Sequence, residues 1–300
     1  MYNKILVPLD GSATAEKILP HARYMAGAFG VPVELLAVVD IGEVASHMVS
    51  EKARFLDSII EGGVRHLTKY LQGVATTFKT GGMSCSVERG RPEDMIIEKA
   101  ETDKSMLVMM ATHGRSGMNR FLLGSVAEKV LRRTVNPLLL VRATDEAKSA
   151  AEATLKSIIV PLDGSRMAEG VLPTVVEIAK KLGLEVELFR AYDIPYNQYR
   201  DDWGFSGSYD ELIGGVRDEA REYLEKKAEE LKLLGVTKVN CVIEEGLAGD
   251  EIITFGRKTA HNLIAMSSHG RSGTMRWLLG SVAETVVRHS ADPVLIIRAV

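Results

Sequence analysis

The chain has 300 residues, of which 46% are hydrophobic and 26% charged, and its formal net charge is −3. This composition excludes a disordered chain, a fibrous repeat and a disulfide-stabilised miniprotein, and the length predicts two domains. The net charge is +2 over residues 1–150 and −5 over the remainder, so neither half has the basic excess that nucleic-acid binding requires.

The first half alternates apolar runs with helical patterns. Continuous apolar runs predict strands at residues 4–9, 32–39, 85–89, 106–111 and 138–142. Helical spacing predicts helices at residues 13–28, 51–77, 93–101 and 125–133, the first of which ends near Gly30. Strands that are apolar on both faces and alternate with helices indicate a parallel sheet covered on each side. Right-handed crossovers then give an open, doubly wound sheet, which binds ligands beyond the carboxyl ends of its strands.

The second half repeats the first. The run ILVPLDGS at 5–12 recurs as IIVPLDGS at 158–165, and HGRSG at 113–117 recurs at 269–273. The offset between the copies grows from 153 to 156 residues, so the second copy has three additional residues in its middle. Residues 144–154 are polar and predict a linker. We therefore expect one domain at residues 1–145 and a second at 154–300.

In each copy the first predicted strand ends in the loop PLDGS, which places Asp10 and Asp163 at the carboxyl edge of the sheet. A carboxylate in this position suits hydrogen bonding to ribose hydroxyls or to the edge of an adenine. The alternative is structural, because Asp and Ser are also the residues that cap helix N-termini. The sequence leaves both roles open.

A second loop follows the fourth predicted strand. It reads ATHG, nine residues, then GSVAE in the first copy, and SSHG, nine residues, then GSVAE in the second. Glycines let backbone amides turn toward a ligand, and a helix N-terminus adds unpaired N–H groups with a partial positive charge. The alternative is that the glycines only let a loop enter a capped helix, since Ser125 with Glu128, and Ser281 with Glu284, fit the capping-box pattern.

The PLDGS loop together with the HGRSG and LLGSVAE block resembles the universal stress protein family, specifically its tandem two-domain members, over nearly the whole chain. ATP-binding members have the pattern Gly, two residues, Gly, nine residues, Gly, then Ser or Thr. This sequence matches the second and third glycines in both copies and has Ala111 and Ser267 at the first position. The resemblance implies two five-stranded, doubly wound parallel sheets, Rossmann-like and similar to adenine-nucleotide alpha hydrolases. It also implies that the halves pair through their last strands, 138–142 and 294–298.

The resemblance implies an ATP site in each half, with or without Mg²⁺. In the first half the implied residues are Pro8, Asp10, Val38, Ala111, His113, Gly114, Gly124, Ser125 and Val126. In the second half they are Pro161, Asp163, Ala191, Ser267, His269, Gly270, Gly280, Ser281 and Val282. The aspartates would contact the nucleoside, backbone groups of Val38 and Ala191 would read the adenine, and the glycines and serines of the second loop would hold the phosphates.

The function implied is that of a nucleotide-sensing regulator in stress response. Two alternatives remain: a nucleotide-free scaffold of the same fold, favoured by Ala111 and Ser267, and an enzyme that splits ATP. The sequence has no G-x-x-x-x-G-K-[S/T] loop. It also shows no pattern of paired carboxylates or of Ser, His and Asp that would indicate a general base or a nucleophile. We therefore assign no catalytic residue and no metal ligand, and expect slow ATP hydrolysis at most. His113 and His269 are interpreted first as structural histidines.

Several remaining features have a structural interpretation. Cys85 and Cys241 lie in predicted strands and are expected to be buried, inert thiols, with a redox pair as the alternative. The aromatic segment 194–210 either packs on its own domain or forms a lid or partner surface, and the charged run 217–232 predicts a solvated helix face. The apolar runs are far shorter than the roughly 20 residues of a membrane span, and no secretory signal precedes Asp10. We expect a cytoplasmic protein and leave a homodimer open.

Overall fold

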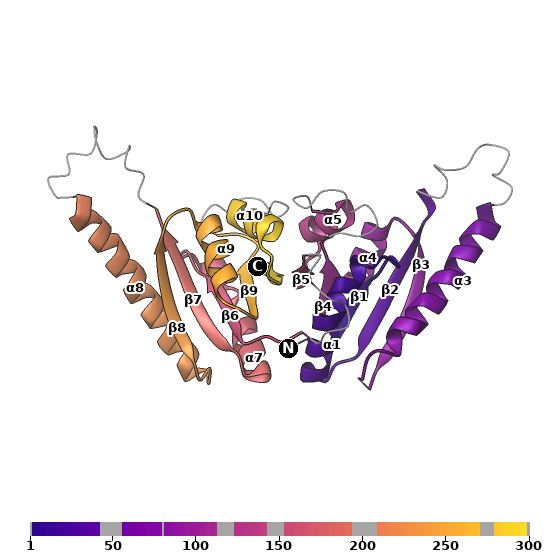
Figure 1. The fold of residues 1–300 in the computed structure, drawn as a ribbon, viewed down its shortest axis with the longest axis horizontal. Helices are drawn as coiled ribbons and strands as arrows, with labels where there is room; N and C mark the ends of the chain where they lie inside the picture. Colours follow the sequence, from indigo (N-terminus) through magenta and orange to yellow (C-terminus); the bar gives the residue numbers. More distant parts are fainter. Residues whose placement is uncertain are drawn as a thin grey trace. The chain divides into compact units, whose positions relative to one another are not determined.

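A computed structural model describes residues 2–42, 56–79, 81–112, 123–142, 153–193, 209–270 and 279–298. Its contacts divide the chain into two compact units, one made of the residues up to Thr154 and the other beginning at Leu155, with Leu295–Arg298 grouped with the first. Both halves are built from alternating strands and helices (Figure 1). Among the described residues, no helix combines the length and the apolar character needed to cross a membrane.

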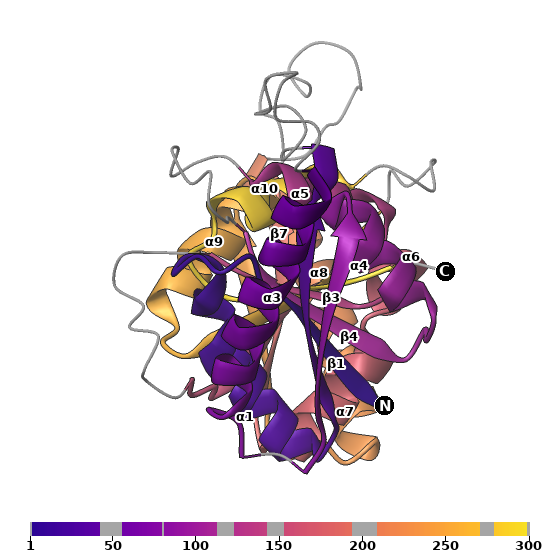
Figure 2. The same cartoon turned by 90° about the vertical axis from the view of Figure 1, so that its right-hand side faces the viewer.

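The elements of the first half follow the predicted order. They are β1 (Lys4–Pro8), the 3-10 helix η1 (Ala15–Ile18), α1 (Leu19–Phe29), β2 (Val33–Asp40), α3 (Leu56–Ala75), β3 (Met83–Gly90), α4 (Pro92–Glu101), β4 (Met106–Ala111), α5 (Ser125–Arg133) and β5 (Leu138–Val141). The strand order is β3-β2-β1-β4-β5, and the pairings from β3 to β5 are parallel. Figure 2 shows α3 running along the outer strands of this half.

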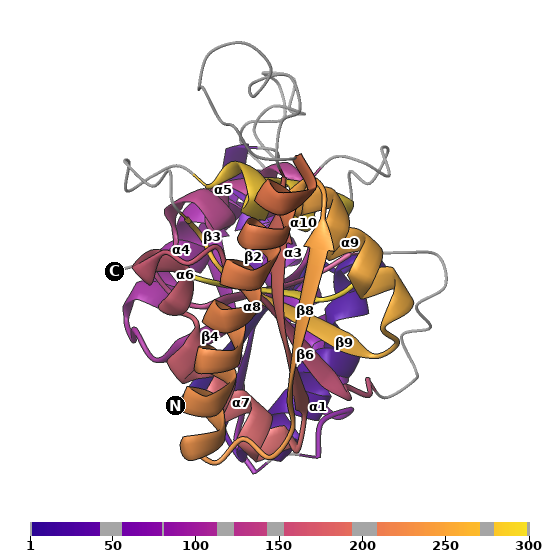
Figure 3. The same cartoon turned by 90° about the vertical axis from the view of Figure 1, so that its left-hand side faces the viewer.

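The second half repeats this arrangement. Its elements are β6 (Ser157–Pro161), α6 (Arg166–Glu169), α7 (Leu172–Leu182), β7 (Glu185–Tyr192), α8 (Tyr209–Leu233), β8 (Val239–Glu245), α9 (Ala248–Lys258), β9 (Asn262–Ser267), α10 (Ser281–His289) and β10 (Val294–Ile297). The strand order is β8-β7-β6-β9-β10, with parallel pairing from β8 to β9. Figure 3 shows α8 in the position equivalent to that of α3.

The chain reverses its direction of travel across each sheet at the central strand. In the first half β1 pairs with β2 on one side and with β4 on the other, and β6 has the equivalent neighbours β7 and β9. Within each half, the connections from the central strand and from its neighbour therefore lead toward opposite edges of the sheet, and they separate at the carboxyl ends of these strands. This is the place where doubly wound sheets accept ligands.

Local sequence explains where the first long helix of each half ends. Gly30 and Gly183 occupy the C-cap position in the left-handed conformation, with φ of 67° and 66°. The amide of Gly30 donates to the carbonyl of Ala26 at 2.9 Å, which satisfies an acceptor that the helix leaves open. Only glycine adopts this conformation without a steric cost, and the predicted end near Gly30 is confirmed.

The two cysteines differ from the expectation that they are buried. Cys85 in β3 is exposed and Cys241 in β8 is partly exposed, and neither forms a disulfide. Desolvation, followed by the charge of Glu34 for Cys85 and of Glu225 for Cys241, raises the pKa of both thiols. They lie in outer strands of their sheets, where only one neighbouring strand covers them, so the expected burial is wrong for Cys85. Their raised pKa agrees with the expectation that the thiols are inert.

A histidine in α1 makes stability depend on pH. The Nδ1 atom of His21 is buried and has no hydrogen-bond partner within the described part of the chain. Burial lowers the pKa of His21 from 6.5 to about 4. Between these two values the unfolded state binds more protons than the native state, so the free energy of unfolding falls as the pH decreases through this window. The fall is about 3 kcal/mol when complete.

The variant His21→Thr tests this contribution, because Thr174 is the counterpart of His21 in the second half. Urea unfolding of the variant between about pH 7 and pH 4.5 should show a shallower loss of stability than the original chain. The difference between the two profiles is the relevant quantity, since other groups titrate in both proteins. Parallel profiles would contradict the assignment to His21.

Candidate functional site

A cavity of about 520 Å³ opens at the carboxyl edge of the first sheet. The loop after β1, the ends of β2 and β4, and the start of α5 all line it, together with α3 and α4. Its lining residues are Pro8, Leu9, Asp10, Ala15, Leu36, Val38, Val39, Asp40, Ile59, Gly63, His66, Leu67, Pro92, Ile96, Met110, Ala111, Thr112, Gly124, Ser125, Val126 and Ala127. The cavity is mostly apolar, with a few polar groups that converge from the loops, as small-molecule sites usually are.

The second half has a smaller cavity, of about 240 Å³, at the equivalent place. Its lining residues are Pro161, Leu162, Asp163, Ala168, Phe189, Ala191, Ala248, Ile252, Met266, Ser267, Ser268, His269, Gly270, Gly280, Ser281, Val282 and Ala283. The loop after β6, the ends of β7 and β9, and the start of α10 therefore converge as their counterparts do. None of the α8 residues whose side chains the structure describes is among them.

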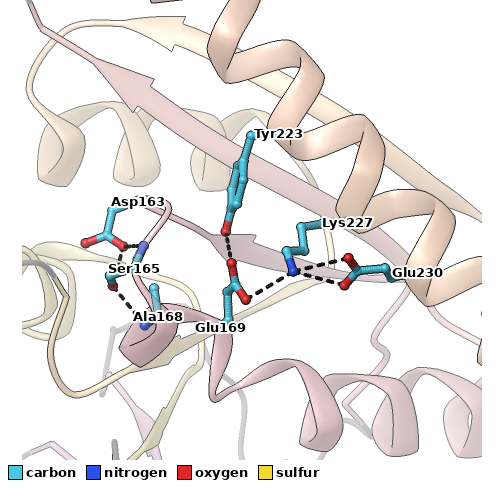
Figure 4. Close-up of polar contacts among 7 residues, drawn as sticks. All are labelled: Asp163, Ser165, Ala168, Glu169, Tyr223, Lys227 and Glu230. Carbon is cyan, nitrogen blue, oxygen red and sulfur yellow. Dashed lines mark hydrogen bonds and ion pairs between the residues drawn. The ribbon is translucent and has the colours of Figure 1, made fainter.

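The first loop of each half is held by its own hydrogen bonds. The Oδ1 atom of Asp10 accepts from the amide of Ser12 at 2.9 Å and from its hydroxyl at 2.6 Å, and the Ser12 hydroxyl accepts from the amide of Ala15 at 3.1 Å. Asp163 and Ser165 make the same contacts, and Figure 4 shows them leading to Ala168. Gly11 and Gly164, with φ of 82° and 86°, permit the turn. Ser165 thus caps α6, whereas no side chain caps η1, and both aspartates also line a cavity.

A tyrosine ties the segment after this loop to the outer helix. The hydroxyl of Tyr70 in α3 donates to Glu16 at 2.9 Å, and that of Tyr223 in α8 donates to Glu169 at 2.9 Å. Desolvation and the hydrogen bond to the glutamate raise the pKa of both tyrosines. Each phenol therefore stays protonated and keeps donating throughout the physiological range.

The helix that follows the second loop begins one residue earlier than the capping-box pattern predicts. The N-cap residues are Gly124 and Gly280, with φ and ψ of −61° and 146°, and −62° and 147°, and no side chain caps either helix. Ser125 and Ser281 are the first helical residues, so the predicted capping box is wrong. The two glutamates pair instead with arginines on the same helix, Glu128 with Arg132 and Glu284 with Arg288.

This geometry leaves the first amides of α5 and α10 without partners inside their helices, because the first N–H groups of any helix lack them. Gly124, Ser125, Val126 and Ala127 line the first cavity, and Gly280, Ser281, Val282 and Ala283 line the second. A helix N-terminus that faces a cavity favours an anion, through its N–H groups and its dipole. The arrangement suits a phosphate or a carboxylate.

The residues that replace the first family glycine are not strained. Ala111 and Ser267 end β4 and β9, and among the described residues His261 alone combines a side chain with a positive φ. Further along the loop a side chain would cause a steric clash, since a Cβ added to Gly270 would overlap the carboxylate of Asp163. A Cβ added to Gly280 would lie 3.3 Å from the carbonyl oxygen of Ser268. The glycines at 270 and 280 thus allow close approaches that the loop requires.

All the predicted site residues that the structure describes line one of the two cavities. In the first half these are Pro8, Asp10, Val38, Ala111, Gly124, Ser125 and Val126, and in the second Pro161, Asp163, Ala191, Ser267, His269, Gly270, Gly280, Ser281 and Val282. His113, Gly114 and most of the segment 194–210 lie outside the described residues. Within the described ranges, no group of three or more His, Cys, Asp or Glu residues is placed to hold a metal ion.

The contribution of α3 to the first cavity was not predicted from the sequence. Ile59, Gly63 and Leu67 line it at intervals of four residues, with His66 beside them. That spacing places the three on one face of a helix, so their common face could have been predicted from the sequence. Their position over the carboxyl edge of the sheet depends on the packing of α3 against β2 and β3, which the local sequence does not contain.

The sequence model described as "Universal stress protein family" matches residues 1–142 and 154–298. A universal stress protein of Methanocaldococcus jannaschii is 31% identical over 148 residues, which cover 49% of this chain and 84% of that protein. Universal stress protein E of Escherichia coli is 22% identical over 307 residues, covering 99% and 94% of the two chains. The crystal structure of a universal stress protein from Archaeoglobus fulgidus superposes with a TM-score of 0.70 at 21% identity, covering 100% of each chain, and shows the same fold.

Proposed function

The chain belongs to the universal stress protein family, and from this premise we propose that it binds an adenine nucleotide, ATP, at the carboxyl edge of its sheets and acts as a nucleotide-sensing regulator in stress response. The regulatory part of the proposal requires that the nucleotide has different affinities for two states of the protein.

The observation that carries the proposal is the convergence of three elements on the first cavity. Asp10 lies in the loop that follows the central strand, Val38 lies near the end of β2, and Gly124 is the N-cap of α5. In the proposed complex Asp10 binds the nucleoside, backbone groups of Val38 orient the adenine, and the first amides of α5 hold the phosphates. The cavity of about 520 Å³ falls within the roughly 300–1,000 Å³ that small-molecule sites occupy.

The unstrained positions of Ala111 and Ser267 support the same proposal over a nucleotide-free scaffold. Their side chains were the features that favoured the scaffold. Because neither residue adopts a positive φ, the loss of the first glycine costs the loop no backbone strain at this point. The remaining predictions, namely Mg²⁺ as a companion ion, pairing of the halves through 138–142 and 294–298, a homodimer and a cytoplasmic location, are part of the proposal.

Heat denaturation of the purified chain, followed by anion-exchange chromatography of the supernatant, tests the proposal directly. We expect ATP, or ADP formed from it, in the released fraction, or uptake of ATP when the purified chain is first incubated with it. A chromatogram without nucleotide after that incubation would favour the scaffold. Continuous formation of ADP or AMP over many turnovers would favour the enzyme.

A further inference from the structure

The two cavities differ on the side of the outer helix. Four residues of α3 line the first cavity, Ile59, Gly63, His66 and Leu67, whereas none of the α8 residues whose side chains the structure describes lines the second. The halves can be compared residue by residue here, because the hydrogen bonds from Tyr70 to Glu16 and from Tyr223 to Glu169 fix the same register, 153 residues apart. The cavity that extends beneath α3 in the first half thus does not extend beneath the described part of α8.

Arg190 fills space between β7 and α8. Arg190 in β7 is 9% exposed, although it is charged. Its guanidinium carbon lies 5.0 Å from the centre of the Tyr223 ring, and its Nη2 atom lies 3.8 Å from Glu219. Both partners belong to α8, so the side chain lies between the sheet and this helix. The counterpart in β2 is Ala37, which is 1% exposed and has only a methyl group to place there.

A second difference lies on the helix itself. Val216 takes the place of Gly63 and stands four and eight residues before Ala220 and Leu224, both of which are fully buried. It therefore lies on the same, inward face of α8. A Cβ added to Gly63 would touch Val39 at 3.4 Å, so even one carbon narrows the gap between α3 and β2. Valine adds two more.

The outer helix of the second half is also held more firmly. Glu169 accepts from Tyr223 on one oxygen and lies 3.1 Å from Lys227 on the other, while Lys227 also lies 3.0 Å from Glu230 (Figure 4). The side chain of Lys227 is 14% exposed, so this ion pair is sheltered from solvent. Its counterpart in α3 is Val74, which cannot make such a bond. The contacts hold α8 over Arg190.

We infer that the adenine nucleotide enters the first half only, and that Arg190 and Val216 exclude it from the second. The inference rests on the proposed function and adds to it the number and the place of the ligands. The second cavity, at about 240 Å³, lies below the roughly 300 Å³ at which pockets for drug-sized ligands begin. Both halves keep the helix N-terminus that can bind an anion. Only the first half keeps enough space beside it for a base and a ribose.

Isothermal titration of the full chain with MgATP and with ATP alone tests this inference. The original chain should bind one nucleotide. The variant Arg190→Ala with Val216→Ala, which removes the bulk beneath α8, should bind two. Alanine is preferred to glycine at 216 because residues 214 and 215 are already glycine. The reverse change, Gly63→Val, should weaken the binding of the one nucleotide about tenfold or more.

Circular dichroism and melting curves of each variant separate misfolding from an altered site. Two nucleotides bound by the original chain would overturn the inference and leave the proposed function intact. One nucleotide bound by a folded Arg190→Ala, Val216→Ala variant would also overturn it. No binding by the original chain, before or after removal of any nucleotide that copurifies, would overturn the proposed function and this inference with it.

Discussion

Gly124→Val is expected to eliminate nucleotide binding while the first half remains folded. Gly124 is the N-cap of α5, with φ of −61° and ψ of 146°, a conformation that valine adopts readily. Its amide donates to the carbonyl of Thr112 at 2.8 Å, so the end of β4 and the start of α5 approach closely there. A branched side chain at this point is expected to crowd the first amides of the helix, where the phosphates would be held.

The expected loss of affinity is about 100-fold or more, equivalent to about 2.7 kcal/mol, because several charge-assisted hydrogen bonds are lost together. Equilibrium dialysis with radiolabelled ATP measures it. Gly27→Val is the matched control, since a Cβ on Gly27, in α1, would have nothing within 4 Å and this residue does not line the cavity. Adding Gly280→Val to Gly124→Val should cause no further loss, because the second half is expected to bind no nucleotide. Affinity retained by a folded Gly124→Val protein would place the phosphate site elsewhere.

Much of the fold could be predicted from the repeated pattern. The bounds predicted for β4 and α5 agree with the structure, because a continuous apolar run and a run of helical spacing both end at abrupt changes of residue type. The start of α5 illustrates a limit. The pattern Ser-x-x-Glu marks a helix N-terminus to within a residue, but it does not distinguish a serine at the N-cap from one that follows a glycine N-cap, and both residues are favoured there.

The parts of the site that escaped prediction depend on long-range packing. The α3 face at Ile59, Gly63 and Leu67 was visible as a pattern, but its place above the cavity follows from how α3 packs on β2 and β3. The burial of Cys85 was predicted wrongly for a related reason, because the sequence of β3 does not indicate that this strand lies at the edge of the sheet. The sequence alone shows that Arg190 differs from its counterpart Ala37. That its side chain lies beneath α8 follows only from its contact with the ring of Tyr223.

The largest expected effect on stability comes from a charge cluster of the first half. Glu34 in β2 has a side chain that is only 5% exposed, and it pairs with Lys4, on Oε2, and with Lys99, at 2.8 Å. Ser86 donates a third bond at 3.0 Å. Desolvation alone would raise the pKa of Glu34, but the hydrogen bonds from Lys4, Lys99 and Ser86 lower it below its ordinary value of 4.5. The buried carboxylate is therefore tolerated because of its partners.

Replacing both lysines, as Lys4→Met with Lys99→Met, should lower the free energy of unfolding by about 3 kcal/mol at neutral pH, because a buried charge loses both of its counterions. The melting temperature should fall by roughly 6–12 °C. The loss should shrink as the pH falls toward 4, since the pKa of Glu34 now lies above its unfolded value and protonation favours the native state. Lys232→Met is the control, because Lys232 and Glu229 form an exposed surface pair that contributes little.

A third change separates charge from packing. Adding Glu34→Gln to the double variant removes the stranded charge and keeps a polar group near Ser86, so part of the lost stability should return at neutral pH. The second half shows that the sheet accepts such an arrangement, because Glu187 is the counterpart of Glu34 and accepts from Asn240 at 2.9 Å, while Ser157 and Phe255 stand where Lys4 and Lys99 do. If the double variant melts like Lys232→Met, the lysines do not compensate Glu34. If the added Glu34→Gln lowers stability further, packing and not charge governs this part of the core.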